Sequence, residues 1–561
     1  MIVVSKNTWI ALATFAIAAA GLAGLGAFPL LDVDEPRFAT ASRNMLRSGD
    51  WIVPWFNGTE RFDKPILVYW LQAAAMALFG QNEFAARLPS ALSIAASVPA
   101  IAAIGSRFGL RGSMPALAGT MVATCAVSQA LGRGATADAL LLACTIWCAK
   151  FQIDSYRDGR LGSALAAWLF GALAFLAKGP PALVAPLALW IGTLAAGRRP
   201  RWTRALLGAA IAIGVVSAWA IPALVRTEGR FWSVGVMHHV VDRSLVPFEG
   251  HGGHEPWWYL FYVVAIPAAL LPWSPFLPVL LRTPRTAIAA DAGDRRVLAC
   301  WFGITALVFT IATSKLAHYP LPGFPPIAIA MALAVQSANS TTQSSPHRIA
   351  QRWTAALLGM LGVLLAAALI AAPIAIEVRP NTAAILAAVT FGGGFLVAAH
   401  RAWSGRLQGA LGAVALTALA GFGQVSSNVA PRVLEGAIAQ VIHADSARLF
   451  PTGRRVFTHA LSMPSLVFYL DREIGALSPL IEGENASTTA LRRLLEPDTC
   501  VITDARRVHE IRSALDDAGP RFDANDRRAL AHCLDSFETL RGFSSNKGKV
   551  IELAILGPRQ D

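Results

Sequence analysis

Charged residues are scarce in this chain. Only 15% of its 561 residues are Asp, Glu, Lys or Arg, whereas 55% are hydrophobic and the mean hydropathy is +0.49. A soluble domain cannot bury that much apolar surface, so the composition indicates a polytopic membrane protein. The formal net charge of +13 does not indicate nucleic-acid binding, because Lys and Arg of membrane proteins gather in cytoplasmic loops and beside anionic lipid headgroups.

Several signatures of nucleotide-dependent and hydrolytic enzymes are missing. The sequence has no Walker A motif, no GxGxxG at the start of a helix and no serine nucleophile elbow. These absences argue against a nucleotide-driven pump and a soluble nucleotide-sugar enzyme. We also find no internal repeat, which argues against a transporter built from two related halves.

Cysteine is rare as well, with six residues. Four lie in apolar runs, where a buried thiol behaves as a small hydrophobic side chain. Cys500 and Cys533 lie in the polar C-terminal region. If that region faces an oxidising compartment, the two could form a disulfide.

Long apolar runs are what the chain has in abundance. A membrane-crossing helix needs about 20 apolar residues, and the N-terminal run lacks a clear signal-peptidase site, so we expect it to remain as the first helix. Fourteen candidate segments are 8–30, 66–80, 88–106, 115–131, 137–153, 161–178, 181–197, 205–224, 258–281, 297–314, 320–336, 354–376, 382–400 and 408–424.

The basic loops give these segments an orientation. "GRRPRWTR" (197–204), "HRIAQR" (347–352) and "RAWSGR" (401–406) fall on one side if every segment after 137 crosses, and that side should be the cytoplasm. The 31–65 loop then lies outside only if 66–80, the shortest candidate, does not cross. We therefore expect thirteen spans, a cytoplasmic N-terminus and an external C-terminus.

The region after the last span has a different composition. Short β-rich runs ("RRVFTHA", "TCVITDA" and "KVIELAIL") alternate with helix-like stretches between 430 and 561. That pattern predicts a small α/β domain. We therefore expect a transmembrane domain over 1–425, with juxtamembrane helices in a first outer loop over 31–87, and a soluble periplasmic α/β domain over 426–561.

Acidic residues from two segments are predicted to meet at the outer boundary of the membrane. Asp34 and Glu35 follow the first span, and Asp138 begins the fifth candidate segment. Ionisable groups at membrane level are costly and usually functional. Each acid could instead cap a helix N-terminus, but topology brings them to the same face.

Basic residues form a second pattern at that face. Three lysines lie near the membrane with a proline close by, and three arginines accompany them: Lys64, Lys178, Lys315, Arg37, Arg133 and Arg243. A single lysine at a helix end often only snorkels to the interface. Six cations beside one or two carboxylates predict a pocket suited to displacing a phosphate leaving group from a lipid-linked donor.

The loop "FEGHGGHEPWW" contains histidines at a loose metal-ligand spacing. His251 and His254, flanked by Glu249 and Glu255, could hold zinc or another divalent ion. The alternative is a pair of solvated loop histidines in a glycine-rich segment. Beyond this possible metal, the sequence indicates no cofactor.

The first outer loop also resembles a known family. "DVDEPRFATASRNMLRSGDWIVPWFNGTERFDKPILVYW", followed by "NEFAARLPSAL", "ATAD", "AKGP", "EPWWYL" and "SKLAHYPLPGFPP", resembles the aminoarabinose transferases that modify lipid A in Gram-negative bacteria. These are part of the wider polyprenyl-phosphate-sugar transferases, which include the protein O-mannosyltransferases. The resemblance covers roughly residues 30 to 335.

This resemblance implies a GT-C fold with about thirteen transmembrane helices and a periplasmic α/β domain. It implies inverting transfer of 4-amino-4-deoxy-L-arabinose from undecaprenyl phosphate to a phosphate of lipid A, in the bacterial inner membrane, giving resistance to polymyxin. We expect a monomer whose partners are these two lipids and the surrounding membrane lipids, with no nucleic acid.

The resemblance also assigns roles to residues. Asp34 and Asp138 correspond to the family's two outer-face acids, which are expected to be catalytic. The expected substrate-binding residues include those of the family's "KP", "YW", "KG" and "SKL…Y" elements, namely Lys64, Tyr69, Lys178 and Tyr319. Glu35, Arg37, Arg133, Arg243 and Lys315 complete the predicted binding set.

Two departures from the family pattern leave the substrate open. "FDKPI" stands where "FEKPP" is more usual, and "DEPRF" has Phe where Tyr is usual. A related transferase with another sugar or a protein acceptor would also fit the first-loop pattern. A lipid-linked-sugar transporter would use the same cationic pocket without chemistry, whereas a non-catalytic scaffold would leave the gathering of acids and lysines unexplained.

Overall fold

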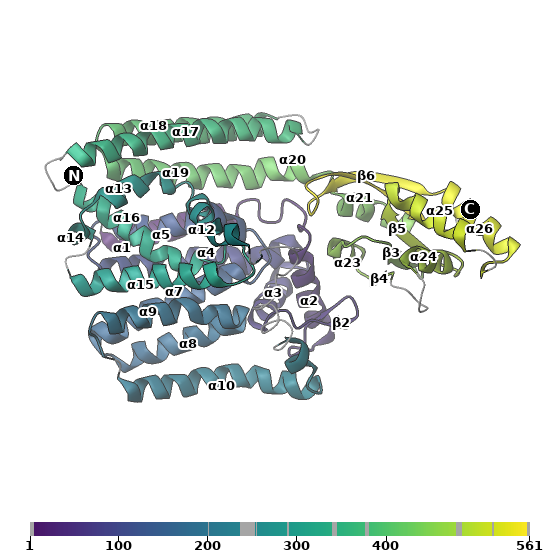
Figure 1. Cartoon of the computed structure of the whole chain (residues 1–561), viewed down its shortest axis with the longest axis horizontal. Helices are drawn as coiled ribbons and strands as arrows, with labels where there is room; N and C mark the ends of the chain where they lie inside the picture. The colour runs from purple at the N-terminus through teal and green to yellow at the C-terminus, as the bar shows by residue number, and fades with distance from the viewer. Residues whose placement is uncertain are drawn as a thin grey trace. The chain divides into compact units, whose positions relative to one another are not determined.

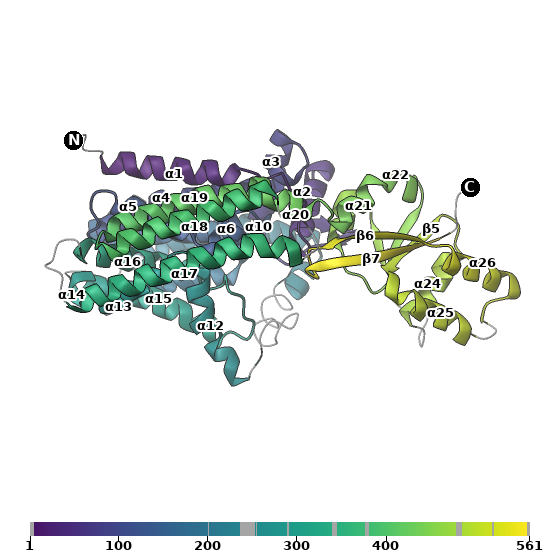
Figure 2. The same cartoon turned by 90° about the horizontal axis from the view of Figure 1, so that it is seen from above.

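The chain forms two compact units in the computed structural model (Figures 1 and 2). The helical unit comprises Met1–Ala27, Met45–Pro54 and Arg61–Val429, and the α/β unit comprises Phe28–Asn44, Trp55–Glu60 and Ala430–Asp561. The structure describes residues 5–199, 201–235, 253, 255–288, 291–338, 345–375, 381–477, 485–518 and 521–557.

The helical unit consists of helices that pack mainly in antiparallel pairs, such as α7 with α8 and α17 with α18 (Figure 1). Its helices are α1 (Lys6–Leu22), α3 (Leu67–Phe79), α4 (Glu83–Arg107), α5 (Met114–Thr124), α6 (Ala126–Gly132), α7 (Asp138–Asp158), α8 (Leu161–Lys178), η1 (Pro180–Leu183), α9 (Val184–Ala195), α10 (Trp202–Arg226), α12 (Pro256–Ala269), η3 (Ser274–Phe276), α13 (Leu277–Arg282), α14 (Arg285–Ile288), α15 (Ala292–Ile311), η4 (Leu321–Gly323), α16 (Phe324–Ala338), α17 (Ser345–Ala375), α18 (Thr382–Trp403), α19 (Leu407–Gln424) and η5 (Val425–Val429). Helix α2 (Asp34–Ser48) contributes residues to both units.

Seven helices in the described part of the chain are long and apolar enough to cross a membrane, or up to nine if each bent pair is one span. The apolar-run prediction of thirteen spans counted shorter and more polar helices as well. For example, α1 has 17 residues and ends at Leu22, because the chain turns at Gly24, which has φ +68° and lies against the backbone of Ser426. Helix α7 is long but carries polar side chains in its last turns.

Two predicted single segments are bent in the structure. Segment 115–131 forms α5 and α6, which meet at 67°, and segment 258–281 forms α12 followed by η3 and α13, which meet at 100°. The two breaks contact each other: the Ala126 N–H donates to the Leu271 carbonyl at 2.6 Å. The Trp273 indole donates to the Thr124 hydroxyl at 3.1 Å. Polar groups at one break thus find partners at the other, as an apolar interior requires.

Helix α3 agrees with the prediction that 66–80 does not cross. Its 13 residues span about 20 Å at 1.5 Å per residue, well short of a ~30 Å hydrocarbon core. The buried Gln72 side chain donates to the Ala86 carbonyl of α4 at 3.0 Å. The polar residue that made this segment a poor span therefore fixes α3 to its neighbour.

The α/β unit contains a five-stranded sheet in the order β4-β3-β5-β7-β6. Strand β3 is parallel to β4 and β5, whereas β7 is antiparallel to β5 and β6. The predicted β-rich runs form β3, β5 and β7. The elements of this unit are β1 (Trp55–Phe56), β2 (Thr59–Glu60), α20 (Ala430–Leu434), α21 (Ile438–Ala444), α22 (Ser446–Leu449), β3 (Arg455–Thr458), α23 (Pro464–Leu470), β4 (Ile474–Ala476), α24 (Ala486–Leu494), β5 (Thr499–Asp504), η6 (Ala505–Arg507), α25 (Val508–Asp517), α26 (Ala524–Asp535), β6 (Glu538–Ser544) and β7 (Lys549–Leu556).

The division into units differs from the predicted boundary in one respect. The C-terminal unit begins at Ala430, close to the predicted 425/426 boundary, but it also includes Phe28–Asn44 and Trp55–Glu60 from the first outer loop. The partly buried Phe56 packs against the core of the α/β unit beside β3 and α23. Packing between segments so far apart in sequence cannot be read from local composition.

The possible disulfide between Cys500 and Cys533 is wrong for this structure. Both residues are free and buried, Cys500 in β5 and Cys533 in α26. Burial raises the pKa of the Cys500 thiol to about 12 and also raises that of Cys533. Each thiol is therefore a protonated core residue that reacts only when the unit opens.

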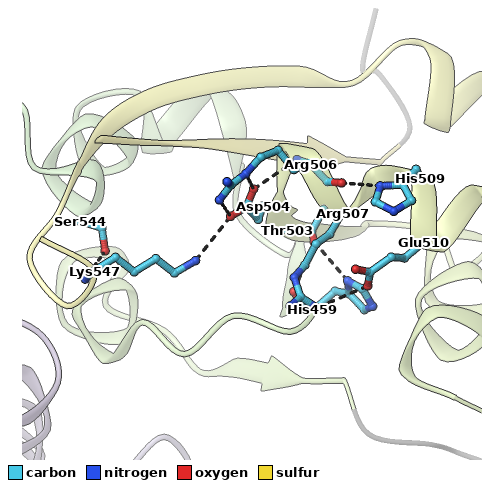
Figure 3. Close-up of polar contacts among 9 residues, drawn as sticks. All are labelled: His459, Thr503, Asp504, Arg506, Arg507, His509, Glu510, Ser544 and Lys547. Atoms are coloured by element: carbon cyan, nitrogen blue, oxygen red, sulfur yellow. Dashed lines mark hydrogen bonds and ion pairs between the residues drawn. The ribbon is translucent and has the colours of Figure 1, made fainter. Parts of the chain in front are cut away.

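A polar cluster occupies the carboxyl ends of β3 and β5 (Figure 3). The buried His459 ring shares hydrogen bonds with the Thr503 hydroxyl through Nδ1 and the Ser487 hydroxyl through Nε2, both at 3.1 Å. Burial lowers the pKa of His459. Nearby, hydrogen bonds from Arg506 chiefly hold the pKa of Asp504 at about 2, so that carboxylate stays ionised.

The lowered pKa of His459 predicts an acid-sensitive α/β unit. The unfolded state binds the histidine proton more readily, so this stabilisation is present above pH ~6.5 and is lost as the pH falls below it. We expect the rate of maleimide labelling of Cys500 and Cys533 in the full chain, divided by the rate for a free thiol such as glutathione at the same pH, to increase from pH 7.5 to 5.5 more steeply than in His459→Gln. The matched control is His509→Gln, at an exposed position; equal pH dependence in wild type and His459→Gln would contradict the prediction.

Candidate active site

The centre of the candidate site is an ion pair between the first residue of α7 and the last residue of α8. A short turn at Gly159 and Arg160 connects these helices, so their distant ends come together in an antiparallel pair. The Lys178 ammonium donates to the Asp138 carboxylate. Their side chains are only 11% and 15% exposed, and a buried charge of either sign needs such a partner.

His318 and Tyr319 complete this cluster from the segment between α15 and η4. The His318 Nε2 atom lies 3.3 Å from Asp138 Oδ1. The Lys178 ammonium lies 5.1 Å from the centre of the Tyr319 ring, a cation–π distance. Tyr319 was predicted to bind substrate, whereas His318 was not. The signal for it was its place in "SKLAHYP", between a predicted lysine and a predicted tyrosine.

Lys315, in the same segment, is buried and contacts the end of α15. Its ammonium donates to the carbonyls of Phe309 at 3.4 Å and Thr310 at 2.5 Å, and also to that of Ala312. A cation that satisfies the last carbonyls of a helix is a C-terminal cap. Lys315 therefore shapes the segment that presents His318, whatever part it takes in binding.

A second cluster surrounds the predicted residues Lys64 and Tyr69. The Arg61 guanidinium donates to the Tyr69 hydroxyl at 3.0 Å and pairs with Asp63 at 2.8 Å. The Lys64 ammonium donates to the Asp63 carbonyl at 3.0 Å.

The two clusters approach each other through the backbone. The structure brings Pro65, the neighbour of Lys64, beside Gly179, the neighbour of Lys178: a Cβ at Gly179 would lie 3.9 Å from Pro65 Cγ. Gly179 has φ +74°, a conformation that glycine adopts without strain. The "KP" and "KG" elements are therefore adjacent in space, as expected for two parts of one site.

Arg133 holds two helices together. Its guanidinium donates to the Gln129 side chain at 2.5 Å and to the Ala20 carbonyl at 2.7 Å. These contacts join the end of α6 to α1. In this structure Arg133 therefore has a packing role, and its predicted role in substrate binding stays a prediction.

Three predicted residues lie in the α/β unit, in the first turns of α2. Asp34 is exposed, Arg37 is partly buried and Glu35 is buried, with a carboxylate that accepts the Leu31 N–H at 2.7 Å. Negative charge at a helix N-terminus complements the helix dipole. The acids thus meet the local requirement of α2, which was the alternative to a catalytic role, and Asp34 also remains accessible.

The remaining predicted residues, Arg243, His251 and His254, lie outside the described residues. Among the residues that the structure describes, no group of three or more His, Cys, Asp and Glu side chains could hold a metal ion. The zinc site therefore stays a prediction about a part of the chain that is not described.

The buried pair predicts a characteristic stability pattern. Lys178→Met should lower the unfolding free energy by about 3 kcal/mol, because among the described residues it leaves His318 as the remaining ionisable partner of the Asp138 charge. Adding Asp138→Asn should recover most of that loss, since no unpaired charge remains. Denaturant titration in detergent measures both.

The control is Lys150→Met, also on α7. Its partner Asp154 keeps a second cation, Arg107, at 3.0 Å, so the loss should stay below about 1 kcal/mol. Equal unfolding free energies of Lys178→Met and Lys150→Met would contradict the prediction that the charges of Asp138 and Lys178 depend on each other.

The chain is similar to known glycosyltransferases in sequence. Residues 63–222 match the model of the dolichyl-phosphate-mannose-protein mannosyltransferase family. Relatives include the undecaprenyl phosphate-alpha-4-amino-4-deoxy-L-arabinose arabinosyl transferases of Edwardsiella ictaluri, 32% identical with 54% of this chain and 55% of the relative covered, and Serratia proteamaculans, 27% identical with 65% of each covered. The chain spans about half the length of several curated relatives, for example 54% of that from Enterobacter sp..

The similarity in structure extends over the whole chain. The crystal structure of ArnT from Cupriavidus metallidurans bound to undecaprenyl phosphate aligns with a TM-score of 0.71, at 19% identity, over 99% of this chain and 100% of that one. Its apo state aligns with the same TM-score. The chain therefore has the GT-C fold of ArnT, and the resemblance to the aminoarabinose transferases that its first-loop motifs predict is confirmed.

Proposed function

We propose that this protein is an integral-membrane glycosyltransferase that moves 4-amino-4-deoxy-L-arabinose from undecaprenyl phosphate to a phosphate of lipid A. The observation that carries the proposal is the partly buried cluster of Asp138, Lys178, His318 and Tyr319. All four lie in elements that resemble the transferase motifs. The similarity to named arabinosyl transferases supports the choice of donor and sugar.

The reaction is a displacement at the anomeric carbon. An oxygen of the lipid A phosphate forms a bond to C1 of the sugar from the face opposite the leaving group, so the configuration inverts. The C1–O bond to undecaprenyl phosphate breaks, and the leaving phosphate keeps the electron pair. Because the acceptor phosphate is already ionised near pH 7, no general base has to remove a proton.

In this scheme the chain supplies charge and orientation. Lys178 and Lys64, on adjacent elements, neutralise the negative charge that grows on the leaving phosphate. Asp138 contacts both the Lys178 ammonium and the His318 ring and holds them in place. Asp34 orients the acceptor or stabilises the positive charge that develops on the sugar ring. Positioning of this kind can supply much of a rate enhancement.

The proposal includes a topology. We expect thirteen crossings of the bacterial inner membrane, with shorter helices such as α1 and the combined stretch of η1 and α9 (Pro180–Ala195) crossing as well as the long apolar ones. The N-terminus lies in the cytoplasm, and the C-terminal α/β unit lies in the periplasm. The basic loops 197–204 and 401–406 support this orientation. We expect the active protein to be a monomer.

The two acids provide the first test. Asp34→Asn and Asp138→Asn should each abolish transfer while the protein still inserts into the membrane, because each removes a charge at the site. Purified protein is incubated with undecaprenyl-phosphate-aminoarabinose and lipid A, and mass spectrometry follows the mass gain of lipid A. The control is Asp516→Asn, at an exposed position of α25.

Full activity of Asp34→Asn would exclude its assigned role. If the wild-type chain modifies no lipid A but modifies a protein or another lipid, the acceptor assignment fails. If it moves the donor across a bilayer without transfer, the chain is a transporter.

His318 provides a second test. His318→Phe should lower kcat by about a hundredfold, the typical effect of removing one polar group from a charge-stabilising site. His318→Gln keeps one hydrogen-bonding group toward Asp138 and should lose less. The control is His400→Gln, at an exposed position at the end of α18. Equal activities of His318→Phe and wild type would remove His318 from the site.

A further inference from the structure

Within the α/β unit, a partly buried carboxylate attaches the segment that leads into α2 to helix α23. Asp32 Oδ1 accepts the Ser465 N–H at 2.8 Å, and Oδ2 accepts the Ser465 hydroxyl at 2.5 Å. Ser465 lies in the first turn of α23, so Asp32 satisfies an N–H group of that helix end. The Asp32 N–H in turn donates to the Ser545 hydroxyl at 3.0 Å. The residue two positions before Asp34 therefore has three hydrogen bonds to the C-terminal sequence.

A second attachment lies nine residues along α2. The Arg43 guanidinium donates to the Phe468 carbonyl at 2.9 Å and forms an ion pair with Asp471 at 3.1 Å. It also lies over the Phe468 ring, 4.7 Å from the centroid. The Arg43 side chain is only 6% exposed. Arg43 thus binds the C-terminal end of α23, and Asp32 binds its N-terminal end.

Two further contacts fix the same surface. The Leu30 N–H donates to the Tyr469 hydroxyl at 2.8 Å. The Asn57 side chain both donates to the Ile474 carbonyl and accepts the Ile474 N–H, each at 2.8 Å. Strand β4 begins at Ile474, so Asn57 pairs with its backbone as a neighbouring strand would. The first outer loop thereby contacts both α23 and β4.

Both attachments place an ionisable side chain where access to water is reduced. Burial raises the pKa of Asp32, and the hydrogen bonds from Ser465 only partly oppose that rise. Holding a charged carboxyl and a guanidinium in a buried place is costly unless their partners are well placed. The two attachments enclose Asp34, Glu35 and Arg37 within a stretch of 12 residues, and their partners lie more than 420 residues away in sequence.

We propose that Asp32, Arg43 and Ser465 are positioning residues for Asp34, and that the C-terminal α/β unit contributes to catalysis because it holds the helix that carries this acid. The proposal rests on the role of Asp34 in the proposed function. Asp32 and Arg43 need touch neither substrate; they fix the place and direction of the first turns of α2. A reacting group displaced by about 1 Å can lose a hundredfold in rate.

The test compares Arg43→Met and Ser465→Ala with Arg448→Met in the full-length protein. Arg448 forms an exposed ion pair with Glu538 at 2.7 Å in the same unit and provides the matched control. We expect kcat for sugar transfer to fall about tenfold or more in Arg43→Met and by less in Ser465→Ala, which keeps the backbone bond to Asp32. The KM for the donor should stay within roughly twofold, and Arg448→Met should match wild type.

Hydrogen exchange provides a readout that does not need activity. Peptides covering residues 30–44 should exchange faster in Arg43→Met and Ser465→Ala, whereas peptides of β5 and β7 should be unchanged, which shows that the unit remains folded. Ser465→Ala keeps the test decisive if Arg43→Met does not fold.

Unchanged kcat in a folded Arg43→Met, or parallel loss in all three variants, would overturn the positioning role. A different result would overturn the proposed function instead: the wild-type protein transfers no sugar, although residues 30–44 still exchange faster in the variants than in the wild type.

Discussion

The helical unit depends on the rule that a charge inside an apolar bundle must have a partner. Asp138 and Lys178 lie at the ends of two helices that are otherwise almost entirely apolar where they meet. Each charge offsets the cost of removing the other from water. The pairing fixes how the ends of α7 and α8 meet. His318 and Tyr319, from a segment far along the chain, contact this pair. The same rule explains Lys315, whose ammonium is satisfied by carbonyls at the end of α15.

Backbone groups follow this rule as strictly as side chains. The breaks after Thr124 and near Leu271 would each leave polar groups without partners in an apolar interior, yet they lie against each other and share hydrogen bonds. The break between α5 and α6 and the break between α12 and α13 thus satisfy each other's polar groups.

The α/β unit shows how one domain can be assembled from distant parts of a chain. Its sheet and most of its helices come from the C-terminal region, but the first outer loop supplies α2 and Asn57, which pairs with the edge of β4. Asp32 accepts the backbone N–H and the hydroxyl of Ser465 in α23. Arg43 donates to a backbone carbonyl of α23 and pairs with Asp471, which follows that helix. These contacts therefore depend on where α23 lies. This is why the loop that carries Asp34 is part of the unit and not merely beside it.

Local patterns in the sequence were enough to predict the helical character, the position of nearly every long helix, the strands β3, β5 and β7, and the family resemblance. Apolar runs and β-rich runs are local patterns, and motifs such as "DKP" and "AKGP" are contiguous. It also singled out Asp138, Lys178 and Tyr319 as members of one site. Other facts became visible in the packed structure: His318 joins these residues, Lys315 caps a helix, Cys500 and Cys533 are free, and Asp32 and Arg43 bind α23. Each of those facts depends on which atoms of distant segments lie within hydrogen-bonding or packing distance, and no local pattern of residues encodes that distance.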